Sequence, residues 1–113
     1  MNKPEQLKAI LDLDRVIHEP ARLAILMVLS GAEWVEFKLL EELTRLTKGN
    51  LSSHLAKLED AGYVAIHKGY RGKVPLTTAS LTDPGRKALA KHWERLKRAA
   101  PQGSQRVRGS SMT

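Results

Sequence analysis

Apolar residues recur at helical spacing in the first part of the chain and predict two consecutive helices. In residues 7–17 they fall close to a 3.6-residue period, whereas residues 1–6 are polar and are expected to fray. Residues 21–29 are apolar almost all round, which is typical of a helix in the core. Glu19 and Pro20 separate the two segments, and proline suits the first turn of the second helix.

The next segments predict two further helices joined by a short polar turn. Leucines at i, i+4 and i+7 predict a third helix over residues 36–46. Thr47 can cap a fourth helix by accepting a hydrogen bond from a free backbone N–H in its first turn. That helix is expected to span residues 47–61 and to stop at Gly62, a residue type favoured just after a helix end.

The pattern then changes to a β-hairpin and a last helix. Residues 63–67 are β-prone, and residues 68–73 predict a loop. Residues 74–81 are rich in Thr and Val and predict the returning strand, where Pro75 suits an edge position. Thr82 is expected to cap the final helix, with an acid and a proline in its first turn.

These elements predict a mostly α fold with a small β-hairpin, in the order α-α-α-α-β-β-α. A helix-turn-helix followed by a hairpin, or wing, is a winged helix-turn-helix. Residues 1–100 are long enough for one hydrophobic core and are expected to form one domain. Residues 101–113 are rich in Pro, Gly, Ser, Gln and Arg, and predict a disordered basic tail.

The fourth helix carries the first candidate binding surface. If Leu51, Leu55 and Leu58 face inward, the opposite face is polar and its side chains are short near the helix start. Such a helix can approach base edges in a DNA major groove, where Asn50 could bind adenine through two hydrogen bonds. An ordinary amphipathic helix with a solvated face is the alternative. The candidate DNA-binding residues of this helix are Lys48, Asn50, Ser52, Ser53, His54 and Lys57.

The expected hairpin loop carries the second candidate surface. Lys68, Arg71 and Lys73 lie in or beside a loop with two glycines and with Tyr70 at its tip. Three cations there could straddle a phosphate backbone or enter a minor groove. A loop charged only for solubility is the alternative. Such a loop directly after such a helix favours a joint DNA-binding function.

The charge distribution agrees with a nucleic-acid partner. The formal net charge is +7, but residues 1–44 carry five Lys/Arg and eight Asp/Glu, a net of −3. Residues 45–73 carry a net of +4 and residues 74–113 a net of +6. Clustered positive charge attracts polyanions. The positive excess therefore begins where the helix-turn-helix pattern begins.

Other features of the sequence exclude several classes of function. The chain has no cysteine, which excludes disulfides, thiolate metal sites and cysteine nucleophiles. Its four histidines lack zinc-site spacing, and no phosphate loop or catalytic constellation is present, so no metal, no cofactor and no enzyme activity is expected. No apolar run is long enough to span a membrane and no signal-peptide core is visible, so a cytoplasmic location is expected.

Two motifs resemble a known family. GNLSSHLAKLEDAGYV, followed by the basic wing and then LTDPGRKAL, resembles the winged-helix transcriptional regulators of the MarR/ArsR-like group, most closely the small winged helix DNA-binding domain proteins. The resemblance covers roughly residues 13–98. It implies a homodimer that pairs through the first and last helices, and base-facing positions at Asn50, Ser52, Ser53 and His54. It also implies contacts of Arg71 and Lys73 with DNA.

The sequence therefore predicts a dimeric, sequence-specific DNA-binding transcriptional regulator, with double-stranded DNA as its partner. A winged-helix protein–protein interaction module without DNA binding is the alternative. Dimerisation would cover two terminal apolar stripes that a chain this short leaves with little core to pack on. Those stripes consist of Leu7, Ile10, Leu11, Leu89, Trp93 and Leu96. A small-molecule effector stays unassigned. For His54, a structural hydrogen bond and a DNA contact are both open.

Overall fold

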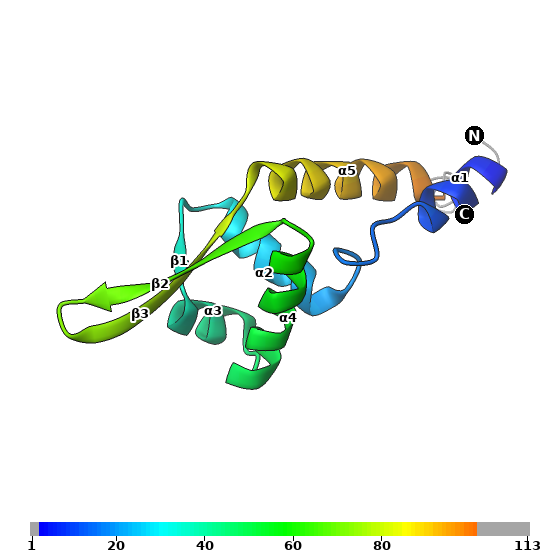
Figure 1. Cartoon of the computed structure of the whole chain (residues 1–113). Coiled ribbons are helices and arrows are strands. Elements are labelled where there is room, and N and C mark those ends of the chain that lie inside the picture. Colours follow the sequence, from blue (N-terminus) through cyan, green and yellow to red (C-terminus); the bar gives the residue numbers. More distant parts are fainter. Residues whose placement is uncertain (1–2, 102–113) are drawn as a thin grey trace, which may run out of the picture.

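The structure, a computed structural model, describes residues 3–101 and contains five helices and three strands within that range. In chain order the elements are α1 (Lys3–Leu11), α2 (Pro20–Ser30), β1 (Val35–Glu36), α3 (Phe37–Thr44), α4 (Lys48–Asp60), β2 (Val64–Arg71), β3 (Val74–Leu81) and α5 (Asp83–Ala99). Figure 1 shows the wing, formed by β2 and β3, extending from one end of the molecule, while α1 and the end of α5 lie at the other. The tail expected from residue 101 lies, beyond Pro101, outside the described residues.

The first helix differs from the prediction at both ends. It begins at Lys3 rather than Leu7, and it ends at Leu11 instead of continuing to Ile17. Asp14 explains the early end, because its carboxylate accepts a hydrogen bond from the backbone N–H of Val16 at 2.9 Å and so stabilises a turn in place of a helix. The same carboxylate accepts a hydrogen bond from the Tyr63 hydroxyl, which raises the pKa of Tyr63 to about 12.

The helix-turn-helix forms by local capping, largely as predicted. Thr47 Oγ1 accepts a hydrogen bond from the Asn50 N–H at 3.2 Å and caps α4. Gly62 follows the helix end with φ +82°, a conformation that glycine adopts without strain. The helix α3 ends two residues earlier than expected, because Arg45 turns the chain with a left-handed φ of 63°.

The sheet corrects the expected order of elements. A strand of two residues, β1, precedes α3 and pairs with the middle of β3, so the order is α-α-β-α-α-β-β-α. The strands lie antiparallel in the order β1-β3-β2. Pro75 sits where β3 has only β2 beside it, opposite Tyr70, so its missing N–H interrupts no second ladder.

The wing is longer and tighter than the expected loop of residues 68–73. β2 continues through Arg71, which pairs with Val74, and only Gly72 and Lys73 form the turn. Gly72 has φ +64°, which suits a two-residue hairpin turn. Tyr70 therefore lies in the strand and not at the tip. Pairing along the whole of β3 supplies the hydrogen bonds that keep this glycine-containing segment extended.

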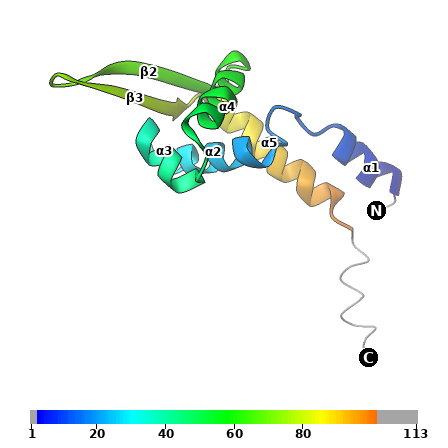
Figure 2. The same cartoon turned by 90° about the horizontal axis from the view of Figure 1, so that it is seen from below.

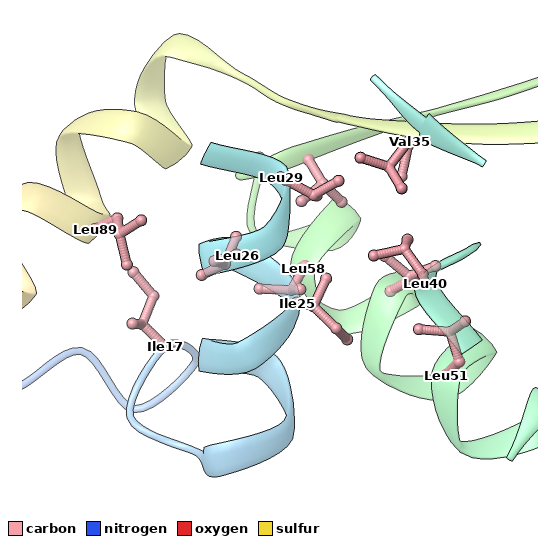
Figure 3. Close-up of a cluster of buried hydrophobic side chains, with 12 residues drawn as sticks. Ile17, Ile25, Leu26, Leu29, Val35, Leu40, Leu51, Leu58 and Leu89 are labelled. Atoms are coloured by element: carbon pink, nitrogen blue, oxygen red, sulfur yellow. The ribbon is translucent and has the colours of Figure 1, made fainter. Parts of the chain in front are cut away.

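The core lies between α2, α4 and the sheet, and it fixes the orientation of α4. Leu51, Leu55 and Leu58 of α4 are buried in it, as their spacing predicts. Figure 3 shows Leu51 and Leu58 among side chains of α2, α3, β1 and α5, with Ile17 and Leu89 at one side of the cluster. Burying a leucine or isoleucine stabilises a fold by about 1.5–3 kcal/mol. Three such anchors fix which face of α4 is turned to solvent.

Candidate nucleic-acid interface

The outer face of α4 is open to solvent. Lys48, Asn50, Ser52, Ser53 and Lys57 are all exposed, as expected from the three buried leucines on the opposite face. At Gly49, in the first turn, a Cβ would meet no described atom within 4 Å beyond its chain neighbours and the backbone of its own helix. The first turn of the helix therefore offers short polar groups and one lysine without steric cover from the protomer.

His54 is placed differently from its neighbours on α4. Its ring is half-buried, and Nδ1 lies 3.1 Å from Nη1 of Arg22 on α2. A guanidinium can only donate, so this contact makes Nδ1 the acceptor and leaves the ring hydrogen on Nε2. The structure thus contains the hydrogen bond within the protomer that was one of the two possibilities for His54. It ties α4 to the start of α2.

Glu19 completes this tie at the N-terminus of α2. Its carboxylate accepts a hydrogen bond from the Arg22 N–H at 2.8 Å and lies 4.0 Å from Nδ1 of His54. Burial by itself would raise the pKa of Glu19, but hydrogen bonds from the Arg22 and Ala21 N–H groups and the charge of Arg22 hold that pKa below its usual value. Arg22 also donates from Nε to the Val16 carbonyl at 2.6 Å. Arg22 thereby connects the turn at Val16, the start of α2 and α4.

The wing carries its three predicted cations on exposed positions. Lys68 and Arg71 lie on β2, whereas Lys73 lies in the turn. Arg71 is not free in this structure: its Nη2 donates to Oε2 of Glu36 on β1 at 3.0 Å. Sequence reasoning missed Glu36, because it lies 35 residues from Arg71 and only the pairing of β1 and β2 with β3 brings the two together.

A hollow of about 690 Å³ joins the wing to the helix-turn-helix. Its lining includes Lys48 and Ser52 of α4, and Lys68 and Arg71 of the wing. Four of the predicted DNA-binding residues therefore border one surface. Figure 2 shows α3 and α4 beside the base of the wing.

The other predicted residues of α4 and the wing lie outside this hollow. Lys57 borders a separate hollow of about 380 Å³, together with Arg15 and Arg22. Asn50 and Ser53 are exposed but do not line the hollow that holds Ser52. Lys73 projects from the turn of the wing. The predicted set thus spreads across the α4 face and along the wing.

The predicted dimer residues divide into exposed and buried groups. Leu7, Ile10, Leu11 and Trp93 are between 40% and 77% exposed, and Leu96 is half-buried. Leu89 differs, since it is only 6% exposed and packs in the core of the protomer. Within one chain α1 lies against α5, and Gln6 Nε2 donates to the Ala100 carbonyl at 3.2 Å. The terminal helices thus present exposed apolar side chains while contacting each other.

Neither a metal cluster nor a membrane span appears between residues 3 and 101. No group of three or more His, Asp or Glu side chains in that range is arranged to hold a metal ion. No helix there is both long and apolar enough to cross a bilayer.

A helix-turn-helix followed by a basic β-hairpin defines a winged-helix protein. Residues 21–100 match the family described as "Winged helix DNA-binding domain", and the chain belongs to this family. The predicted resemblance to small winged-helix regulators is thereby confirmed. The uncharacterized protein MJ0432 of Methanocaldococcus jannaschii is 40% identical over 76 residues, which cover 66% of this chain and 82% of that relative.

Solved structures share the fold. The transcriptional regulator homologue protein from Pyrococcus horikoshii OT3 superposes with a TM-score of 0.75 and 31% identity, over 82% of this chain and 91% of its own. Sco3205, a MarR family transcriptional regulator from Streptomyces coelicolor solved in complex with DNA, gives a TM-score of 0.62 at 21% identity. That match covers 94% of this chain and 78% of the Sco3205 chain. The roles named for these structures are regulatory and not enzymatic.

Proposed function

We propose that this protein is a dimeric, sequence-specific DNA-binding transcriptional regulator. One observation carries the proposal: exposed α4 residues and wing cations border a single hollow, so one duplex can contact both. The positive excess of residues 45–73 lies on these same elements. A winged helix used only for protein assembly would need neither the short polar face of α4 nor the cations of the wing.

The helix α4 is proposed to enter the major groove with its first turns leading. Asn50, Ser52 and Ser53 are short enough to hydrogen-bond base edges, and an Asn amide matches adenine in two places. Lys48 sits at the helix N-terminus, where the helix dipole favours a phosphate. Lys57 and His54, further along α4, would lie beside the base-reading positions.

The wing is proposed to grip the phosphate backbone or the adjacent minor groove. Lys68, Arg71 and Lys73 follow the hairpin to its tip, and arginine in particular fits phosphates and narrow minor grooves. These contacts position the protein without reading bases directly. Base preference is therefore assigned to α4, and the larger part of the sequence-independent affinity to the wing.

The proposed dimer pairs the terminal helices through their exposed apolar side chains. Leu7, Ile10 and Leu11 of α1 and Trp93 of α5 would form its centre, with Leu96 at its edge. Two α4 helices related by a twofold axis would then meet major grooves about 34–36 Å apart, on a nearly palindromic site.

Binding to duplex DNA across a salt series tests this function. Affinity for a random-sequence duplex should fall steeply between about 50 and 200 mM salt, because cations on the protein release counterions from phosphates. Lys73→Ala should weaken binding to all sequences alike and lower the salt slope by about one. Asn50→Ala should instead relax base preference at one position of a selected site, by about 1–3 kcal/mol.

Lys97→Ala provides the matched control, since Lys97 is an exposed cation in the last turn of α5. Figure 1 shows this end of α5 at the end of the molecule away from the wing. The control substitution should leave the salt slope almost unchanged. Duplex binding that is absent, or that does not respond to salt, would support the interaction module instead. An unaltered site preference in Asn50→Ala would remove Asn50 as a base reader.

A further inference from the structure

We propose that Glu36 is an internal competitor for DNA phosphate, which pairs with the wing's Arg71 and lowers the affinity of the free protein for any duplex. The proposal rests on the function above and assigns a role to a residue outside the predicted DNA-binding set. Oε2 of Glu36 lies 3.0 Å from Nη2 of Arg71, at the edge of the hollow between α4 and the wing.

Arg71 differs from the other cations that line the hollow, because it already has an ion-pair partner there. Lys38, Lys48 and Lys68 also line it, but between residues 3 and 101 only Arg71 has an ion pair across it. A phosphate that approaches Arg71 must therefore replace a carboxylate that is already in place. It must also tolerate the negative charge of Glu36 nearby, which lies in the surface proposed to face a polyanion.

The contact is weak enough to be exchanged. The side chain of Arg71 is 65% exposed and that of Glu36 is 35% exposed, so water screens their attraction. Exposed pairs of this kind contribute little to stability. A phosphate contact that comes with counterion release can compete with such a pair. Glu36 thus lowers the affinity of the wing without blocking it.

The backbone around Glu36 keeps its carboxylate at this place. Glu36 is the last residue of β1, where it pairs with Thr78 of β3, and it directly precedes the first turn of α3. Its carboxylate does not cap α3, because no hydrogen bond from it to the N-terminal N–H groups of that helix is present. The side chain is therefore available to Arg71 across the sheet.

Glu36→Gln tests the proposal in the full-length chain. It keeps the shape of the side chain and removes the charge. Affinity for a fluorescent random-sequence duplex at low salt should rise by up to about fivefold, the upper range for an exposed pair. The salt slope should change little, because Arg71 contacts a phosphate in the complexes of both proteins and only the competition in the free protein is removed. Fluorescence anisotropy measures both quantities.

Glu41→Gln is the matched control. Glu41 lines the same hollow but has no ion pair in the described part of the chain. It reports the effect of removing one negative charge from this surface without freeing an arginine. In an Arg71→Gln background, Glu36→Gln should raise affinity no more than Glu41→Gln does. This non-additivity separates competition for Arg71 from general repulsion of DNA.

Two results would overturn the proposal. Equal effects of Glu36→Gln and Glu41→Gln in the wild-type background would mean that Glu36 acts only through general charge. Weaker binding by Glu36→Gln would mean that the pair braces the wing in a DNA-binding position. Either result leaves the DNA-binding function standing. A wild-type chain without salt-dependent duplex binding would remove the function and this inference together.

Discussion

At the residue scale, His92 has an environment that makes its charge unfavourable. It is 1% exposed, and neither ring nitrogen has a hydrogen-bond partner among residues 3–101. The ring packs near those of His18 and Trp93, with centroid distances of 5.5 and 5.4 Å. Burial lowers the pKa of His92, and the charges of His18 and Arg95 add to the effect while Asp14 opposes it. The ring of His92 is thus buried by its own chain.

This burial predicts acid sensitivity of the fold. Because the pKa of His92 is lower in the folded state than the ordinary value of 6.5, the unfolded chain binds this proton more readily. The contribution of neutral His92 to stability is therefore present above about pH 6.5 and declines as the pH falls toward the folded pKa. His92→Leu should reduce the loss of unfolding free energy between about pH 7.5 and pH 5, measured by urea denaturation.

The exposed histidine of the wing is the control for that measurement. His67→Gln replaces an exposed imidazole on β2 and should retain the acid sensitivity of the wild type. If His92→Leu loses as much stability on acidification as the wild type, another group controls the response.

Two glycines should respond to the same substitution with opposite signs. A Cβ at Gly85, in the first turn of α5, would lie 2.1 Å from the backbone oxygen of Tyr63, so Gly85→Ala must displace the backbone. We expect it to destabilise the fold by about 2 kcal/mol or more. Gly49→Ala meets open space on α4 and should stabilise by up to about 1 kcal/mol. Thermal or urea denaturation measures both changes in the free energy of unfolding. Equal changes of the same sign would contradict the packing described around Gly85 and Gly49.

At the scale of elements, local signals in the sequence were sufficient for helix starts and stops. Thr47 and Thr82 cap α4 and α5 through hydrogen bonds to residues three positions ahead, and Gly62 ends α4. Each of these effects acts within one turn, so a short stretch of sequence contains the information. The inward face of α4 was predictable for the same reason, since three leucines at helical spacing define it.

Elements that depend on distant partners were not predictable from local pattern. β1 has two residues and exists because Val35 and Glu36 pair with β3, more than 40 positions away in the chain. The extension of β2 to Arg71 likewise depends on its ladder with β3. The ties from Glu36 to Arg71 and from Arg22 to His54 follow from the same tertiary placement. The secondary-structure propensity of a short segment does not depend on such distant partners, so it cannot predict these contacts.

At the scale of the whole molecule, the proposed DNA-binding surface and the proposed dimer interface lie at opposite ends. Figure 1 shows the wing at one end of the molecule and α1 beside the end of α5 at the other. The wing and α4 carry exposed cations, whereas α1 carries exposed apolar side chains. Soluble chains rarely leave neighbouring large apolar side chains in water without a partner. A twofold pairing at that end leaves both basic surfaces free for one duplex.

Leu11→Glu tests this arrangement most directly. Leu11 is 77% exposed at the end of α1, so a charge there should change the protomer's melting temperature little. In a twofold interface the charge would appear twice, and burying each leucine is worth about 1.5–3 kcal/mol, so the dimer dissociation constant should rise by about a hundredfold or more. Leu43→Glu makes the same change on α3, at a 55% exposed leucine away from the terminal helices, and should leave the dimer intact. Sedimentation velocity at micromolar concentration separates the outcomes. A wild type that sediments as a monomer there would remove the dimer, and with it the expectation of a palindromic site.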